Sequence, residues 1–175
     1  ALDARRLVFL DEAGVSAAES RRFGWAPKGY TPVIARPARA RRLNLVGAIA
    51  VDGIRALELL DGYFNGETFL AFLRNSLGPT LNAGDIVVMD GSSIHKVKGV
   101  AEVLAEFGAS ALYLPGYSPE LNPIEMTWAW MKKLIRDVPT RTFGKLKAKA
   151  LETWNQVSAV LCAAWIRHAG YGPST

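Results

Sequence analysis

The spacing of apolar and polar residues predicts that strands and helices alternate along this chain. Short, continuous apolar runs are typical of buried strands, and they occupy residues 6–12, 43–51, 55–60, 85–90 and 109–115. Helical spacing marks residues 66–78, 95–108, 123–136 and a long stretch over 143–168. Asp52 and Gly53, between the second and third runs, indicate a hairpin. The order predicts an α/β fold with a mixed central sheet of about five strands flanked by helices.

Composition narrows the classes of protein that this chain can belong to. The chain has 175 residues, of which 50% are hydrophobic, so we expect a single domain, residues 1–175, with a substantial core. No apolar run has the length of a membrane span, and the first residues lack the apolar region of a signal peptide. The single cysteine, Cys162, excludes an internal disulfide and fits a reducing, cytoplasmic location as a buried helical thiol.

Positive charge is concentrated in the first third of the chain. Residues 1–50 carry nine Lys and Arg against four Asp and Glu, whereas the remaining residues carry twelve of each. The densest group consists of Arg36, Arg39, Arg41 and Arg42. It is either a solvated connection before a strand or a loop that contacts phosphates. It contains no glycine-rich cradle, so it is not a nucleotide-binding P-loop.

Three carboxylates occupy positions at which chemistry is often found in α/β proteins. Asp11 and Asp90 each end a predicted strand, and Glu125 opens a helix after the proline-rich stretch 114–123. Locally, Asn122 is a good N-cap and Glu125 completes a capping box, which is a purely structural interpretation. Alternatively, the three carboxylates converge and bind Mg²⁺, which prefers oxygen ligands. Two such ions can activate a nucleophile and stabilise the leaving oxygen of a phosphodiester.

Three motifs carry a resemblance to a known family. "LDEAG" from Leu10, "VVMDGSSIH" from Val87 and "LPGYSPELNPIE" from Leu114 together resemble the catalytic domain of bacterial insertion-sequence transposases of the mariner-like DDE superfamily. The resemblance implies a ribonuclease-H-like fold that cuts DNA at transposon ends and joins the ends to target DNA. It implies that Asp11, Asp90 and Glu125 form a triad that binds Mg²⁺ or Mn²⁺, with two ions expected. Gly91 departs from the family, which usually has Asn after the second Asp.

Several other side chains have two interpretations. His95 is either a helix-start histidine in contact with solvent or, by the resemblance, a residue near the scissile phosphate or the attacking water. We expect Glu12 to point away from Asp11 because side chains alternate along a strand, which makes it a supporting or solvent-facing residue. Trp128 and Met131 are expected in the core.

Residues outside the triad are candidates for contacts with DNA. Trp25 either stacks on a base or sugar or covers the sheet as a hydrophobic plug. Lys132 either complements the dipole of its helix or touches a phosphate, and Lys28 joins the same group of candidates.

The resemblance also shapes our expectations for domains and partners. The helix-turn-helix region with which the family recognises transposon ends is expected to be absent from this chain, leaving one DDE catalytic domain. Double-stranded DNA is the expected partner, in the cytoplasm and at the nucleoid when bound, with no membrane. A homodimer and a separate polypeptide that carries DNA recognition remain open. Two alternatives also remain open: a ribonuclease-H-like nuclease without strand transfer, and a decayed or domesticated core that only binds DNA.

Overall fold

A five-stranded mixed sheet lies at the centre of the protein, seen in a computed structural model that describes residues 3–16, 25–31, 41–137 and 142–172. The strands are β1 (Leu7–Ser16), β2 (Arg42–Ala50), β3 (Gly53–Leu60), β4 (Ile86–Met89) and β5 (Ser110–Tyr113). Their order across the sheet is β3-β2-β1-β4-β5. β1, β2 and β3 pair antiparallel, whereas β4 and β5 run parallel to β1. The prediction of a mixed sheet of about five strands flanked by helices is confirmed.

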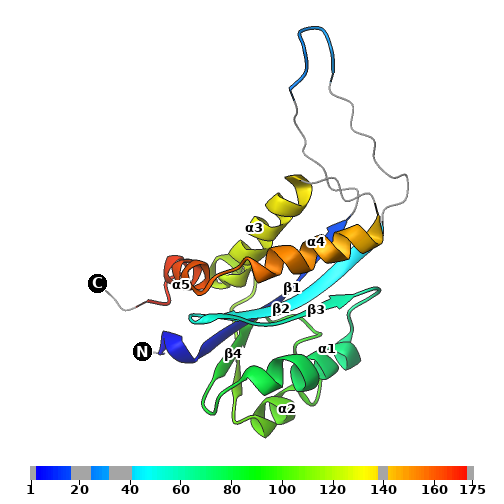
Figure 1. The fold of residues 1–175 in the computed structure, drawn as a ribbon. Helices are drawn as coiled ribbons and strands as arrows, with labels where there is room; N and C mark the ends of the chain where they lie inside the picture. Colours follow the sequence, from blue (N-terminus) through cyan, green and yellow to red (C-terminus); the bar gives the residue numbers. More distant parts are fainter. Residues whose placement is uncertain (1–2, 17–24, 32–40, 138–141, 173–175) are drawn as a thin grey trace.

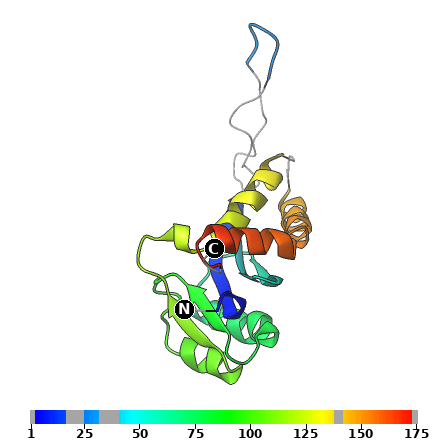
Figure 2. The same ribbon diagram turned by 90° about the vertical axis from the view of Figure 1, so that its left-hand side faces the viewer.

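Helices cover both faces of this sheet (Figure 1, Figure 2). One face carries α1 (Gly66–Phe72), the π-helical turn Leu73–Leu77 that continues it, and α2 (Val100–Glu106). The other face carries α3 (Ile124–Asp137), α4 (Phe143–Asn155) and α5 (Ala159–His168). Short 3-10 segments span Ala4–Arg6, Gly78–Thr80 and Pro119–Leu121.

β1 contributes to two separate hydrophobic cores because its successive side chains point to opposite faces. Leu7 and Phe9 pack with the α3, α4 and α5 layer, whereas Val8 and Leu10 pack with the α1 and α2 layer. This burial on both faces explains why the strand is a continuous apolar run rather than an alternating one. Trp128 and Met131 are buried in the first of these cores, as expected.

Three boundaries differ from the sequence prediction. The expected helix over 143–168 is interrupted between Asn155 and Ala159, where the Ser158 hydroxyl caps a new helix by accepting a hydrogen bond from the Leu161 N–H. The helix expected from His95 begins only at Val100, directly after Gly99, whose φ is 107°. β1 does not end at Asp11 but continues to Ser16 because β2 pairs with it that far.

Other features agree with expectation or limit it. Cys162 is buried in α5, and its burial raises the pKa of the thiol to about 11. Of the helices in the described ranges, none has both the length and the apolar character needed to cross a bilayer. The described stretch 25–31 lies away from the sheet in both views (Figure 1, Figure 2), and Trp25 there is fully exposed. Trp25 therefore does not cover the sheet as a plug.

Candidate active site

The pairing of β1 with β4 brings Asp11 and Asp90 to neighbouring positions. The parallel register pairs Phe9 with Val88, the last such pair, and β4 ends at Met89. Asp90 follows the end of β4 directly, two residues after the pair of Phe9 with Val88, as Asp11 follows Phe9, so both aspartates lie at the same edge of the sheet. Asp11 is 9% exposed within β1, whereas Asp90 lies in the loop that follows β4 and is exposed.

Glu125 reaches the same edge of the sheet because the chain before α3 is attached to β1. The side-chain amide of Asn122 donates a hydrogen bond of 3.2 Å to the carbonyl of Leu10, the residue before Asp11. The predicted capping box is wrong, since the Asn122 N–H donates to the Pro119 carbonyl and not to Glu125. Asn122 therefore positions the start of α3 against β1, and Glu125 is left without the capping role.

The three carboxylates line one cavity of about 510 Å³, together with Asn122 and residues of the loops after β4 and β5. The pKa of Asp11 is raised to about 8, first by burial and next by the negative charge of Glu125, with Asp90 adding to the effect. The charges of the cavity therefore act on one another, although the side chains come from β1, the β4 loop and α3.

His95 is fully buried and holds Asp90 in place. Its Nδ1 lies 2.6 Å from a carboxylate oxygen of Asp90, and its Nε2 lies 2.9 Å from the Glu12 carboxylate. Burial lowers the pKa of His95 most, but the hydrogen bond to Glu12 and the nearby acidic charges outweigh it, so the pKa is raised. In its doubly protonated form the ring can donate to both carboxylates. The expectation of a solvent-contacting histidine is wrong, and Glu12 is a supporting residue.

The donor set of the cavity fits a hard divalent cation. Carboxylate oxygens are the ligands that Mg²⁺ and Mn²⁺ prefer, and a cation would relieve the repulsion that raises the pKa of Asp11. Within the described part of the chain, however, no three Asp, Glu, His or Cys side chains are already gathered closely enough to hold one ion. The carboxylates would have to move inward on binding.

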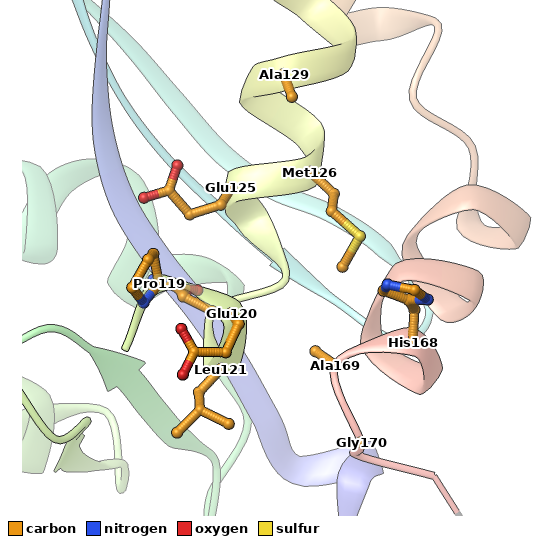
Figure 3. A pocket seen from close by; sticks show the side chains of 10 residues that line it. Pro119, Glu120, Leu121, Glu125, Met126, Ala129, His168, Ala169 and Gly170 are labelled. Carbon is orange, nitrogen blue, oxygen red and sulfur yellow. The ribbon is translucent and has the colours of Figure 1, made fainter. Parts of the chain in front are cut away.

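A second cavity of about 580 Å³ shares Pro119, Asn122 and Glu125 with the first as lining residues. Met126, Ala129, His168 and Ala169 line it, and Figure 3 shows the Glu125 side chain leaving α3 on the side opposite to Met126. His168 is exposed at this cavity.

The described residues among those predicted to contact DNA do not line the carboxylate cavity. Arg36 and Arg39 are outside the described residues. The Arg41 guanidinium forms an ion pair with Asp61 and stacks 4.2 Å from the ring centroid of Phe143. Trp25, Lys28 and Arg42 are exposed and Lys132 is half-buried, and none of these described residues lines the cavity.

Sequence reasoning missed two residues of the cavity wall. Lys96, directly after His95, lines the cavity, and so does Tyr117, which is fully exposed at a φ of 57°. A non-glycine residue in that region stores backbone strain, which is often found at functional sites. The position of Lys96 beside a motif histidine was the signal that could have identified it.

Comparison with known proteins gives a family and a fold. The sequence pattern described as DDE superfamily endonuclease matches residues 6–148. The structure is similar to the "Mos1 transposase paired-end complex with left transposon end", with a TM-score of 0.79, 20% identity, and 95% of this chain and 52% of that chain covered. It is also similar to the "Crystal structure of the catalytic domain of Mos1 mariner transposase", with a TM-score of 0.67, 17% identity, and 94% and 77% covered.

These similarities cover only part of the Mos1 chains and are of low sequence identity. The chain spans about half the length of the Mos1 chains in the paired-end complexes, including the one with Mn (TM-score 0.80, 20% identity, 94% of this chain covered). At this level of identity the structures establish the fold, which is ribonuclease-H-like as expected. No curated protein sequence matches the chain.

Proposed function

Since the chain belongs to the DDE superfamily endonucleases, we propose that it is the catalytic core of a DNA transposase, which cuts and joins DNA at transposon ends. One observation carries the proposal: Asp11, Asp90 and Glu125, from three separate elements, line a single cavity. Carboxylates with purely structural roles would not need to line the same cavity. The alternative role of Glu125, a helix cap that accepts from the Asn122 N–H, is not formed.

We assign the three carboxylates as metal ligands, with Mg²⁺ or Mn²⁺ as the ion and two ions expected. Bound divalent cations would supply activation of the nucleophile and stabilisation of the leaving oxygen. Asp11 must release its proton to act as a ligand, because its raised pKa keeps it protonated in the metal-free protein near neutral pH. His95, supported by Glu12, holds Asp90 at the cavity edge as a positioning residue.

The proposed chemistry has two steps of the same kind. In the first, water attacks the phosphorus at the transposon end, the bond from phosphorus to the 3′ oxygen breaks, and a 3′ hydroxyl and a 5′ phosphate result. In the second, that 3′ hydroxyl attacks a phosphorus of target DNA and displaces its 3′ oxygen. The protein's part is to hold the reacting phosphodiester at the cavity of Asp11, Asp90 and Glu125.

The partners follow from this chemistry. Double-stranded DNA is the proposed substrate, which is supported by the Mos1 structures named as a paired-end complex and as a strand transfer complex. We further propose that this chain is one catalytic domain that acts on bacterial DNA in the cytoplasm and nucleoid. Recognition of the transposon ends would then depend on a helix-turn-helix region or polypeptide beyond these 175 residues, and a homodimer would hold two ends.

A nicking assay tests the core of the proposal. The protein should convert supercoiled plasmid to the nicked form in Mg²⁺ and not in EDTA. Asp90→Asn should fold normally but lose nicking, because the amide keeps the shape of the side chain and removes the charge that a hard cation needs. An Asp90→Asn protein as active as the parent would contradict the assignment.

A strand-transfer assay separates the proposal from its nuclease alternative. A DNA duplex with a free 3′ hydroxyl at a transposon-end sequence, offered with a target plasmid, should become joined to the plasmid. Nicking without joined product would favour a plain nuclease, and binding without nicking would favour a DNA-binding core.

A further inference from the structure

The cavity of the three carboxylates is also lined by a cationic side chain, that of Lys96, which has no role in the chemistry proposed above. Of the described residues that line it, Lys96 is the only Lys, Arg or His. Its ammonium lies 5.8 Å from the ring centroid of Tyr113, and among the described residues no carboxylate comes within ion-pair distance of it. A positive charge that faces a cavity without an acidic partner is available to an anion that enters.

Gly91 lies directly beside this ammonium. A Cβ atom at residue 91 would lie 3.0 Å from the Lys96 Nζ and 3.6 Å from its Cε. Gly91 does not have the positive φ that seven other described glycines have, so the backbone does not require glycine there. The contact at 91 is one of space: a side chain there, such as the Asn common in the family, would be in tight contact with the end of Lys96 and would require the ammonium to shift.

The backbone at Lys96 is held in place although its side chain is exposed. The preceding residue, His95, is fixed through the carboxylates of Glu12 and Asp90, and its carbonyl accepts a hydrogen bond of 2.9 Å from the Tyr113 hydroxyl. The Cα of Lys96 is therefore held at the cavity wall while its flexible stem can follow a ligand. Lysine binds phosphate as a compact point charge without a fixed geometry.

We propose that Lys96 forms a phosphate-binding subsite at the mouth of the carboxylate cavity, which takes a non-bridging oxygen of the DNA backbone, and that Gly91 makes room for it. The inference rests on the proposed function, since it names a residue that receives the same substrate. Carboxylates repel an approaching phosphodiester, and one cation among them offsets this repulsion where the phosphate must enter.

Binding measured without catalysis tests this subsite. Affinity for a short random-sequence DNA duplex is measured in EDTA over a range of salt concentrations. Lys96→Met should weaken binding several-fold and flatten the plot of log affinity against log salt by about 0.9, the contribution of one phosphate contact. Lys96→Arg should retain most of the affinity. Lys98→Met is the matched control, because it removes the same charge from an exposed position that does not line the cavity.

A double-mutant cycle tests the part of Gly91. Gly91→Asn should weaken DNA binding by the parent, because it displaces the ammonium. The same substitution should have little further effect on DNA binding by the Lys96→Met variant. Equal slopes for Lys96→Met and Lys98→Met, or an equal effect of Gly91→Asn in both backgrounds, would overturn the subsite. If the parent binds and nicks DNA, such a result leaves the proposed function standing. A parent that neither binds nor nicks DNA would overturn both.

Discussion

At the scale of single residues, Glu125 is the side chain whose two interpretations the structure separates most clearly. The Asn122 N–H is already bound to the Pro119 carbonyl, so no capping contact is lost when the Glu125 carboxylate is changed. A defect of Glu125→Gln can therefore be assigned to the lost charge and not to a weakened helix start.

We expect Glu125→Gln to unfold at or above the parent's temperature in EDTA, because it removes a charge that repels Asp11, and to lose both nicking and the stabilisation by Mg²⁺. An ion that binds only the folded state adds about 2.7 kcal/mol at one hundred times its Kd, which a thermal melt detects. Glu120→Gln is the matched control, because Glu120 lies on the neighbouring 3-10 turn and does not line the carboxylate cavity. Full Mg²⁺-dependent nicking by Glu125→Gln would remove this residue from the triad.

The raised pKa of Asp11 should make the stability of the metal-free protein depend on pH. Its ordinary pKa is 3.8, whereas in the folded protein it is about 8, so between these values the folded state retains a proton that the unfolded chain has lost. The free energy of unfolding of the metal-free protein should therefore fall as pH rises through this window, by up to about 1.4 kcal/mol per pH unit from this group.

Urea unfolding at a series of pH values checks this expectation. Asp11→Asn should be more stable than the parent, and the difference should grow from pH 5 to pH 8, because the amide has no proton to lose. Glu102→Gln, at an exposed position of α2, supplies the control for a removed surface charge. A difference between Asp11→Asn and the parent that does not change with pH would contradict the raised pKa.

At the scale of elements, the distance between α3 and the sheet decides whether Glu125 reaches the aspartates. Gly47 of β2 pairs directly with Asp11 across the sheet. A Cβ at residue 47 would lie 2.8 Å from the Trp128 indole and 3.0 Å from that of Trp154, two rings that stack at a centroid distance of 5.8 Å. The absence of a side chain at Gly47 therefore lets α3 and α4 pack closely at the level of Asp11.

Gly47→Ala should cost about 1–3 kcal/mol in the free energy of unfolding, the usual range for an overpacked core. It should also reduce nicking, because α3 carries Glu125 outward when Trp128 is displaced. Urea unfolding and the plasmid assay measure the two effects. Gly144→Ala, in the first turn of α4 with no atom within 4 Å of the added Cβ, should be as stable as the parent or slightly more so.

At the scale of the whole molecule, the net charge of +5 favours a polyanionic partner. Arg41 and Arg42, the two described residues of the arginine group, have different surroundings. Arg41 forms an ion pair with Asp61 and lies over the ring of Phe143, whereas the guanidinium of Arg42, the first residue of β2, lies over Gly14 of β1. DNA has to compete with Asp61 for Arg41, which lowers what that residue can contribute.

We expect the salt dependence of DNA binding to reflect this division. Replacing Arg39, Arg41 and Arg42 together by Gln should flatten the slope of log affinity against log salt, with about 0.9 for each phosphate contact removed. Arg42→Gln alone should flatten it more than Arg41→Gln alone. Fluorescence anisotropy with a labelled duplex gives the slopes, and a triple variant with the parent's slope would exclude this segment from the DNA interface.

The sequence by itself determined the strands and the hairpin, and it singled out the three carboxylates that line the cavity. These features depend on local patterns: continuous apolar runs are buried strands, and Asp11, Asp90 and Glu125 follow or interrupt such patterns at recognisable points. The break at Ser158 and the late start of α2 after Gly99 were also encoded locally, but a continuing helical pattern of apolar residues obscured both.

Only the tertiary structure decided that the three carboxylates line one cavity and which residues support them. The Asn122 amide donates to the carbonyl of Leu10, 112 residues away in the sequence, and does not form a local cap. His95 contacts Asp90 and also Glu12, which is 83 residues away from it. Lys96 and Gly91, five residues apart in the sequence, line the same cavity wall. Such contacts depend on strand register and on the space between packed elements, and neither is written in the residues next to each side chain in the sequence.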